Sequence, residues 1–270
     1  GHLLPAGAAA GNAVSRDSAV KVATEVGGAL EFVPMYDHRS LTLLLKHLLH
    51  AVVATTGAGP YTHTYDVGVS RVGLSAQVIA GLSETLTDNA RRFTGLVCSS
   101  WTFSCEAGGL CKISSEWIGT GGTAFQAVSG TIAVVDSEEI VAAHMNNASL
   151  TPWNSRQLYL QSFSIKCDYK LARTPAVGLY VSTKPVLSDF TEITVTAKAQ
   201  ARAELIHDDY LAGTTSDFPV VFAGTSPGTL TFDVHNCKLT KCDLMLSAPG
   251  EIMYDLEWRR GRAHARRGRA

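Results

Sequence analysis

Residues 93–119 read FTGLVCSSWTFSCEAGGLCKISSEWIG, and this stretch indicates the fold most clearly. Its residues alternate with the period of two that places successive side chains on opposite faces of a β-strand. One expected face carries Val97, Ser99, Trp101, Phe103 and Cys105, followed by Cys111, Ile113, Ser115 and Trp117. The other carries Cys98, Ser100, Thr102, Ser104 and Glu106, followed by Lys112, Ser114 and Glu116. Because Ala107-Gly108-Gly109 separates the two runs, we expect a β-hairpin with one apolar face and one polar face.

Alternation recurs along most of the remaining chain, and its longest run extends from Ile193 to Leu205. A leucine stripe over residues 41–52 predicts one strong helix, with Asp37 or Ser40 as its N-cap, and a weaker helix is expected from Asp136. The sequence therefore predicts a mainly β (α+β) fold, an antiparallel β-sandwich or barrel with one flanking α-helix. Further strands are expected at residues 61–70, 72–79, 158–169, 178–184, 218–223, 229–243 and 251–258.

The composition is that of a globular protein. The chain has 270 residues, of which 46% are hydrophobic and 17% are charged. This length suffices for a large core, and this balance excludes a disordered chain and a coiled coil. No apolar run approaches the roughly 18 residues that a membrane span requires, and the first residues lack the profile of a secretory signal. We therefore expect a globular, intracellular protein.

The charge is distributed unevenly along the chain. The formal net charge is −1, yet the last twelve residues hold six arginines and no acidic residue, so residues 1–257 carry −7. An arginine-rich end can bind phosphates or the acidic surface of a neighbouring copy, or it can serve as a disordered, solubilising end. Residues 1–20, rich in Gly and Ala, are expected to form a flexible arm. The arginines are Arg259, Arg260, Arg262, Arg266, Arg267 and Arg269.

The six cysteines are interpreted as small buried residues, because most of them lie in strand-like segments and none forms a Cys-x-x-Cys pair. They are Cys98, Cys105, Cys111, Cys167, Cys237 and Cys242.

Motifs for catalysis or metal binding are weak. Residues 224–228 match the Gly-x-Ser-x-Gly pattern of hydrolases, but a strand-like segment follows where that mechanism needs a helix. His47 and His50 could share one helix face with His63 nearby, although no carboxylate or cysteine completes a metal site. Residues 207–210, His-Asp-Asp-Tyr, are interpreted as a polar loop. We therefore expect no catalytic residues, no metal and no cofactor.

The hairpin stretch resembles the tail tube proteins of long-tailed, siphovirus-like bacteriophages, which share a pattern of F-x-G, a strand, E-A-G-G, a strand and I-G. The leucine-rich helix followed by Tyr61-Thr62-His63-Thr64-Tyr65 is similar to another part of that family, as are Gln161 to Ile165 and the closing strands from Leu230. The resemblance covers residues 36–257. It implies an N-terminal arm at residues 1–35, a tail-tube domain at 36–257 and a basic tail at 258–270.

The resemblance further implies a structural, non-enzymatic virion protein of the phage tail, assembled in the host cytoplasm. Six copies would form a ring, and stacked rings would form a tube for DNA delivery. Its partners would be itself, the tail terminator and tail-tip proteins, the tape measure protein, and DNA in transit without sequence specificity, with no membrane. We expect the basic tail to contact neighbouring subunits. The candidate residues for the lumen are Ser100, Thr102, Ser104, Glu106, Ser114 and Glu116, with Trp101, Phe103, Ile113 and Trp117 packed inward.

Two alternatives remain open. The chain could be another component of a tail or secretion tube, such as a tail terminator, or a nucleic-acid-binding module that uses the arginine-rich tail. Tubes of indefinite length would favour a tail tube protein over a tail terminator. A monomer that shifts the mobility of DNA would favour the nucleic-acid-binding module. Residues 119–126 and 207–218 are candidates for loops between stacked rings.

Overall fold

A computed structural model describes most of the chain, including long strands and two helices. The described residues are 3–5, 19–21, 26–34, 40–57, 62–68, 73–79, 90–122, 148–150, 153–155, 158–173, 185–200, 205–223, 229–247 and 251–260. The weaker helix expected from Asp136 and the strand expected at 178–184 lie outside these residues.

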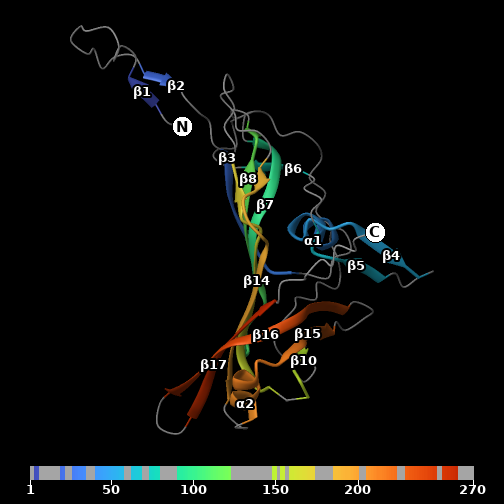
Figure 1. Ribbon diagram of the computed structural model, residues 1–270. Coiled ribbons are helices and arrows are strands. Elements are labelled where there is room, and N and C mark those ends of the chain that lie inside the picture. The colour runs from blue at the N-terminus through green and yellow to red at the C-terminus, as the bar shows by residue number, and fades with distance from the viewer. Residues whose placement is uncertain are drawn as a thin grey trace, which may run out of the picture.

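The fold is predominantly antiparallel β, as the alternation predicts (Figure 1). One large sheet has the strand order β10-β15-β16-β17-β14-β11-β7-β8-β3, and β6 and β9 also pair with β7. Because this path has two ends, the sheet is not closed into a barrel. The strands of the sheet are β3 (Val26–Phe32), β6 (Leu74–Ile79), β7 (Ala90–Glu106), β8 (Lys112–Gly119), β9 (Gly121–Gly122), β10 (Ala148–Leu150), β11 (Leu160–Asp168), β14 (Glu192–Gln200), β15 (Thr215–Ala223), β16 (Thr229–Ser247) and β17 (Glu251–Arg260).

Among the described residues, three short strand pairs are separate from the large sheet. They are β1 (Leu3–Pro5) with β2 (Ala19–Lys21), β4 (Val53–Thr56) with β5 (Thr62–Tyr65), and β12 (Leu171–Ala172) with β13 (Val186–Leu187). Strand β3 lies within the segment expected to form the N-terminal arm, and it pairs with β8 along its whole length. Strand β17 continues through Trp258 and Arg259 to Arg260, so it includes the first residues of the expected basic tail.

The helix α1 (Ser40–Leu48) lies against one face of the sheet. Its leucine stripe is buried at Leu41, Leu45 and Leu48. The helix ends earlier than predicted, because His50 adopts a φ of 50° and the Ala51 N–H donates to the Lys46 carbonyl at 3.0 Å. This arrangement is the Schellman closure of a helix. Val52, which the pattern assigned to the stripe, is 77% exposed.

A second helix, α2 (Leu205–Ala212), differs from the sequence prediction. The expected long strand ends at Gln200, and the expected polar loop at His207–Tyr210 is helical. Ile206 and Asp209 face inward, where the Asn154 side-chain amide donates to the Asp209 carboxylate at 3.0 Å. Gly213, at a φ of +65°, ends the helix as a left-handed cap.

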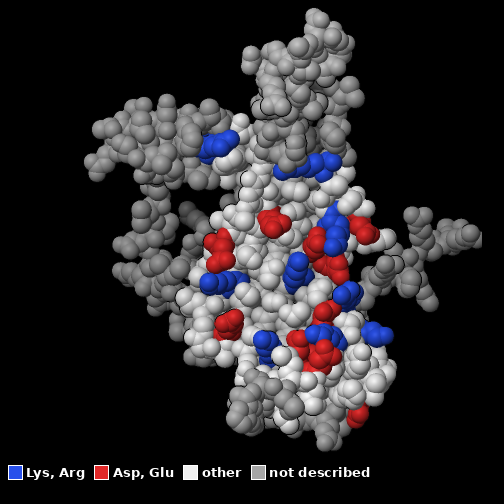
Figure 2. Space-filling view, turned by 90° about the vertical axis from the view of Figure 1, so that its left-hand side faces the viewer, with Lys and Arg blue, Asp and Glu red and all other residues white. Residues whose placement is uncertain are grey.

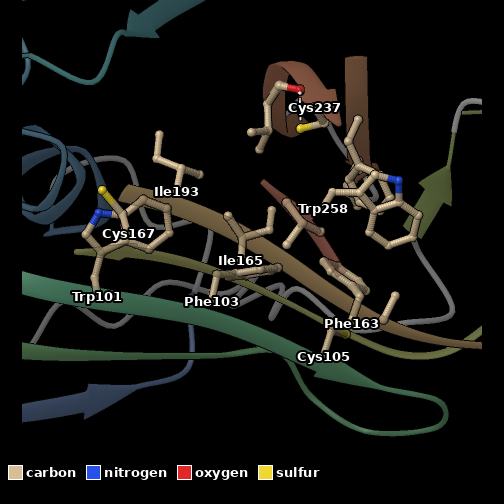
Figure 3. Close-up of a cluster of buried hydrophobic side chains, with 14 of the residues drawn as sticks. Trp101, Phe103, Cys105, Phe163, Ile165, Cys167, Ile193, Cys237 and Trp258 are labelled. Carbon is tan, nitrogen blue, oxygen red and sulfur yellow. Dashed lines mark hydrogen bonds between the residues drawn. The ribbon is translucent and has the colours of Figure 1, made fainter. Parts of the chain in front are cut away.

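The main core lies between the apolar face of β7, β11, β14 and β17 and the elements that cover it (Figure 3). Strand β16 pairs with β15 through its first half and with β17 through its second half. Register shifts on both sides of this change let the strand bend, so Phe232 packs on Phe103 with ring centroids 4.4 Å apart. Phe222 of β15 contacts the same ring at 5.4 Å. The sheet thereby folds over its own apolar face.

A buried hydrogen-bond network joins α1 to the sheet. The Tyr169 hydroxyl donates to the Leu48 carbonyl at 2.6 Å and accepts from the Trp101 indole N–H at 3.2 Å. The His50 ring stacks on Tyr169 with centroids 4.0 Å apart, and its Nε2 donates to the Cys98 carbonyl at 2.9 Å. These contacts satisfy polar groups that burial would otherwise leave unpaired.

Candidate functional site: the polar face of the large sheet

The predicted hairpin is present as β7 and β8. Phe103 lies opposite Ile113, and Ser104 lies opposite Lys112. The turn closes through a hydrogen bond from the Gly109 N–H to the Glu106 carbonyl at 2.9 Å, and Gly108 supplies the positive φ of 74° that the turn requires. The two-residue alternation therefore sets the two faces as expected over residues 100–117.

The side chains predicted to pack inward are buried. Trp101, Phe103, Ile113 and Trp117 are each at most 7% exposed. The six candidate residues for the lumen lie on the opposite face, where Glu106, Ser114 and Glu116 are exposed and Ser100, Thr102 and Ser104 are half-buried. The structure thus places the two predicted sets on opposite faces of the hairpin.

One part of the predicted hairpin pattern is wrong. Cys98 was expected on the polar face, but it is fully buried, and Ser99 was expected on the apolar face, but it is half-exposed. A β-bulge between Cys98 and Ser100 is the cause, because Cys98 lies opposite Trp117 while Ser100 lies opposite Glu116. The Ser99 hydroxyl donates to the Glu116 carbonyl at 3.1 Å across this bulge.

Polar residues from neighbouring strands align in rows across the sheet, and we call the resulting surface the polar face. One row joins Ser104 to Ser164, Thr196, Glu257 and Lys241. Three further rows lie parallel to it. They contain Glu106, Ser162, Lys198, Asp255 and Asp243; Glu31, Ser114, Thr102, Lys166, Thr194, Arg259 and Lys238; and Glu116, Ser100, Asp168 and Glu192.

Acidic and basic side chains are mixed on the polar face (Figure 2). The four rows and Lys112 contain eight carboxylates and six basic groups, which gives a net charge of −2. Eight serine and threonine hydroxyls lie among them, and two of these, Ser164 and Thr196, hydrogen-bond to each other at 2.7 Å. The face is therefore not purely one of hydroxyls and carboxylates.

Several of the basic groups are held by carboxylates. Lys241 lies 2.5 Å from Asp255 and 3.3 Å from Asp243, and these two contacts raise the pKa of its ammonium group. Arg259 lies 2.8 Å from Glu257 and 3.3 Å from Glu192, and its pKa is likewise raised. Lys112 pairs with Glu31 at 3.4 Å. By contrast, Lys166, Lys198 and Lys238 form no close ion pair with a carboxylate among the residues that the structure describes, although the charge of Lys166 helps to lower the pKa of Asp168.

Beside the polar face, Lys170 makes a tight turn after β11. Its ammonium group lies 2.7 Å from Asp168 and 3.4 Å from Glu192. Partial burial acts to raise the pKa of Asp168, but the hydrogen bonds from the Lys170 side chain and backbone N–H outweigh it and lower that pKa. Both members of this pair therefore stay charged at neutral pH.

The arginine tail is described only at its start. Arg259 belongs to the polar face and is ion-paired within its own chain, and Arg260 is exposed at the end of β17. The remaining four candidates, Arg262, Arg266, Arg267 and Arg269, lie outside the described residues.

The residues of the weak catalytic and metal motifs take up the following positions in the fold. The His50 ring donates a hydrogen bond to the Cys98 carbonyl, and the His63 ring hydrogen-bonds to the Thr55 hydroxyl at 3.0 Å. Strand β16 begins directly after residues 224–228 and pairs with β15, so the serine of that segment is not followed by a helix. No helix in the described ranges is long and apolar enough to span a membrane.

One polar cluster was missed at the sequence level. His235 lies between two aspartates, with Nδ1 at 3.1 Å from Asp217 and Nε2 at 3.6 Å from Asp233. The hydrogen bond to Asp217 raises the pKa of His235, although all three side chains are exposed. Asp233 and His235 share one strand face by their spacing, but Asp217 reaches them only through the pairing of β15 with β16.

The comparison with protein families bears on the function directly. A model of the phage tail tube protein family matches residues 12–259, which is most of the chain. The chain belongs to the phage tail tube protein family. It is therefore a structural protein of the phage tail tube and a component of the virion, as the hairpin resemblance implied. No curated protein matches the chain in a sequence comparison.

Membership of this family gives the polar face a context. A tail tube subunit associates with copies of itself and with other tail proteins. A surface that is polar and ion-paired can then lie either in contact with solvent or against a neighbour. The chemistry of the face, with its hydroxyls and paired charges, suits contact with water better than tight packing.

Proposed function

We propose that this tail tube protein assembles into stacked, six-membered rings that form a conduit for DNA delivery, with the polar face lining the bore. The observation that supports this most is the contrast between the two faces of one sheet. The apolar face is buried under α1, β15 and the bent half of β16, whereas the polar face crosses seven strands, from β3 to β16, and its side chains are exposed or half-buried. The lumen candidates Ser100, Thr102, Ser104, Glu106, Ser114 and Glu116 belong to this face.

The electrostatics of the polar face support passage rather than retention of DNA. Each contact between a basic group and a phosphate adds affinity, and such contacts dominate nonspecific binding. On this face Lys112, Lys241 and Arg259 are already paired with carboxylates, and the excess charge is negative. A bore lined in this way would hold DNA weakly and would wet readily.

The open ends of the sheet support assembly by strand contacts. Strand β3 pairs with β8 on one side and has no strand on its other side among the described residues. An exposed strand edge offers unpaired N–H and C=O groups to another chain. In the proposed ring, such edges would join successive copies, with the N-terminal arm and the basic tail adding contacts around them.

The proposed partners follow from this role. The ring would bind other rings, the tail terminator at one end and tail-tip proteins at the other, and the tape measure protein would occupy the bore during assembly. DNA would pass through without sequence-specific contacts.

Electron microscopy of the purified full chain tests the proposal. We expect tubes of indefinite length whose averaged end-on views show sixfold symmetry. The variant Thr102→Cys, labelled with maleimide-gold before assembly, should place gold density on the tube axis, because Thr102 lies on the polar face. Thr64→Cys is the matched control, since Thr64 is an exposed strand residue of β5 outside that face, and its label should lie off the axis.

Two outcomes would contradict the proposal. Gold from Thr102→Cys on the outside of otherwise normal tubes would show that the polar face does not line the bore. A chain that stays monomeric under all assembly conditions, or that forms single capped rings, would exclude the tube itself.

The basic tail is tested separately by deleting residues 261–270, which keeps the ion-paired Arg259. We expect assembly that becomes sensitive to salt at lower concentrations than in the full chain, because contacts between arginines and an acidic neighbour would be lost. Tubes with unchanged salt tolerance would show that the tail is not an assembly contact.

A further inference from the structure

Two cysteines face each other across the turn of the β7–β8 hairpin. Ser104 lies opposite Lys112, and one step further along the same register brings Cys105 opposite Cys111. Directly opposite residues of an antiparallel pair have Cα atoms about 4.5–5.5 Å apart, which lies within the range that a disulfide spans. Both side chains are buried and reduced, at 2% and 0% exposure.

The two sulfur atoms interact directly in the reduced state. The Cys111 thiol hydrogen-bonds to the Cys105 sulfur, and this contact lowers the pKa of Cys105. The same contact, together with burial, raises the pKa of Cys111. One sulfur of the pair is thereby favoured as the thiolate, which is the reactive form in thiol chemistry.

We propose that Cys105 and Cys111 form a redox modification site, a reversible cross-strand disulfide that staples the hairpin carrying the polar face. Oxidation breaks the two S–H bonds and forms one S–S bond, and the two electrons and two protons pass to an oxidant of the diazene or low-molecular-weight disulfide class. A diazene is reduced to a hydrazine, and a disulfide is reduced to two thiols. A dithiol reductant reverses the step.

The position of the pair gives an oxidant access despite the burial. Five residues, 106–110, separate Cys105 from Cys111 at the turn of the hairpin, and among them Glu106 is exposed and Leu110 is 53% exposed. Local opening at such a turn requires far less free energy than global unfolding. Figure 3 places Cys105 at the end of the apolar cluster, beside Phe163, which lies opposite it on β11.

The other thiols are less suited to the same reaction. Cys167 lies opposite Trp101 rather than Cys98, and the Cys98 thiol donates to the Ser100 carbonyl at 3.3 Å. Burial raises the pKa of Cys167 to about 12, so very little thiolate is present at neutral pH. Cys98 and Cys167 therefore serve as an internal control for buried thiols on neighbouring strands.

A virion protein meets both redox conditions that the site needs. The host cytoplasm keeps thiols reduced during assembly, and particles released into an aerobic medium are exposed to oxidants. The disulfide would then form after assembly. It would hold the hairpin closed in the free particle.

The test is oxidation of the purified full chain by diamide, followed by alkylation with N-ethylmaleimide and digestion with trypsin and a glutamate-specific protease. Because Glu106 lies between the two cysteines, a disulfide should link the peptides 93–106 and 107–112, with Cys98 alkylated. We expect this linked species to dominate over any link between Cys98 and Cys167 by at least tenfold. Dithiothreitol should release both peptides.

The linked protein should also melt about 5 °C higher than the reduced protein, since a short cross-link restricts the unfolded chain. Under diamide, Cys111→Ser should show neither the linked peptides nor the rise in melting temperature. If that variant folds poorly, the peptide map of the wild-type protein still tests the proposal. Complete alkylation of Cys105 and Cys111 after diamide treatment would overturn the proposal. Random linkage among all the cysteines would overturn it equally.

Discussion

The network around Tyr169 allows a quantitative prediction. Tyr169→Phe keeps the ring that stacks on His50 but removes the hydroxyl that bridges the Leu48 carbonyl and the Trp101 indole N–H. A hydrogen bond contributes about 0.5–1.5 kcal/mol net, and a buried group left without a partner costs about 1–3 kcal/mol. Since both former partners stay buried, we expect a loss of about 2–4 kcal/mol in the free energy of unfolding.

The measurement is urea unfolding of the unassembled subunit, followed by far-UV circular dichroism and tryptophan fluorescence. A change of this size lowers the melting temperature by roughly 5–10 °C for a domain of this length. Helix α1 should also lose protection from hydrogen exchange, because the bond to the Leu48 carbonyl joins its last turn to the sheet.

Tyr65→Phe is the matched control. The Tyr65 hydroxyl is buried and has no hydrogen-bond partner among the described residues, so its removal should change stability by less than about 0.5 kcal/mol or improve it. A Tyr169→Phe variant that unfolds within about 0.5 kcal/mol of the wild type would refute the network as the anchor of α1. Equal losses in both variants would attribute the effect to the ring environment instead.

Three further predictions concern the backbone, pH and the polar face. Gly95→Ala should destabilise the protein by more than about 1 kcal/mol in urea unfolding, because Gly95 has a φ of +63° and a Cβ there would overlap the Thr120 hydroxyl. Gly28→Ala is the control and should be nearly neutral, because its added Cβ meets no atom within 4 Å. A larger loss of stability in Gly28→Ala than in Gly95→Ala would contradict the reasoning. The raised pKa of His235 means that its pairing with Asp217 stabilises the fold below pH about 6.5 and is lost as pH rises through the raised value. His235→Gln should therefore cost stability at pH 5.5 and almost nothing at pH 8.5, and an equal cost at both would exclude the ion pair. Replacing Lys166, Lys198 and Lys238 with glutamine should reduce both the retention of short duplex DNA by assembled tubes and the salt dependence of that retention. The control Lys46→Gln, on the exposed side of α1, should change neither. Equal effects of the two replacements would show that the polar face does not contact DNA.

The sequence predicted the two faces of the hairpin best, because two alternating runs are joined there by the Ala107-Gly108-Gly109 turn. Trp101, Phe103 and Ile113 could be assigned to the core because a period of two leaves no other face for them. The β-bulge at Ser99 broke the same pattern, since a single extra residue reverses the facing of every residue beyond it. Nothing in the composition of residues 97–100 distinguishes a regular strand from a bulged one.

Helix α2 was missed for a different reason. The alternation from Ile193 continues in the sequence as far as Leu205, and the helical signal after it is short. Gly213 as a left-handed cap was the available clue, together with Ile206 and Asp209 at a spacing of three. The burial of Asp209 depends on Asn154, more than fifty residues away, so its helical role was decided by tertiary contacts.

The extent of the polar face also lay beyond sequence reasoning. Each strand shows its own polar positions, but the order β8-β7-β11-β14-β17-β16 brings together segments that are not consecutive in the chain. The ion pair of Arg259 with Glu192 illustrates this, because it joins residues of β17 and β14 that only the sheet makes neighbours. The hairpin alone contributes two carboxylates and one basic group, Glu106, Glu116 and Lys112, whereas the face across all its strands carries eight carboxylates and six basic groups.

The hydroxyls on the polar face bear on the proposed conduit. Serine is not among the residues that favour strands, and any polar residue would satisfy a face that merely contacts bulk water. Yet serine recurs at positions 100, 104, 114, 162 and 164, on the three adjacent strands β8, β7 and β11. A short hydroxyl projects little and carries no charge, so it neither narrows a bore nor binds a phosphate strongly. The repeated use of serine therefore suits the smooth, weakly binding wall that the proposed bore would need.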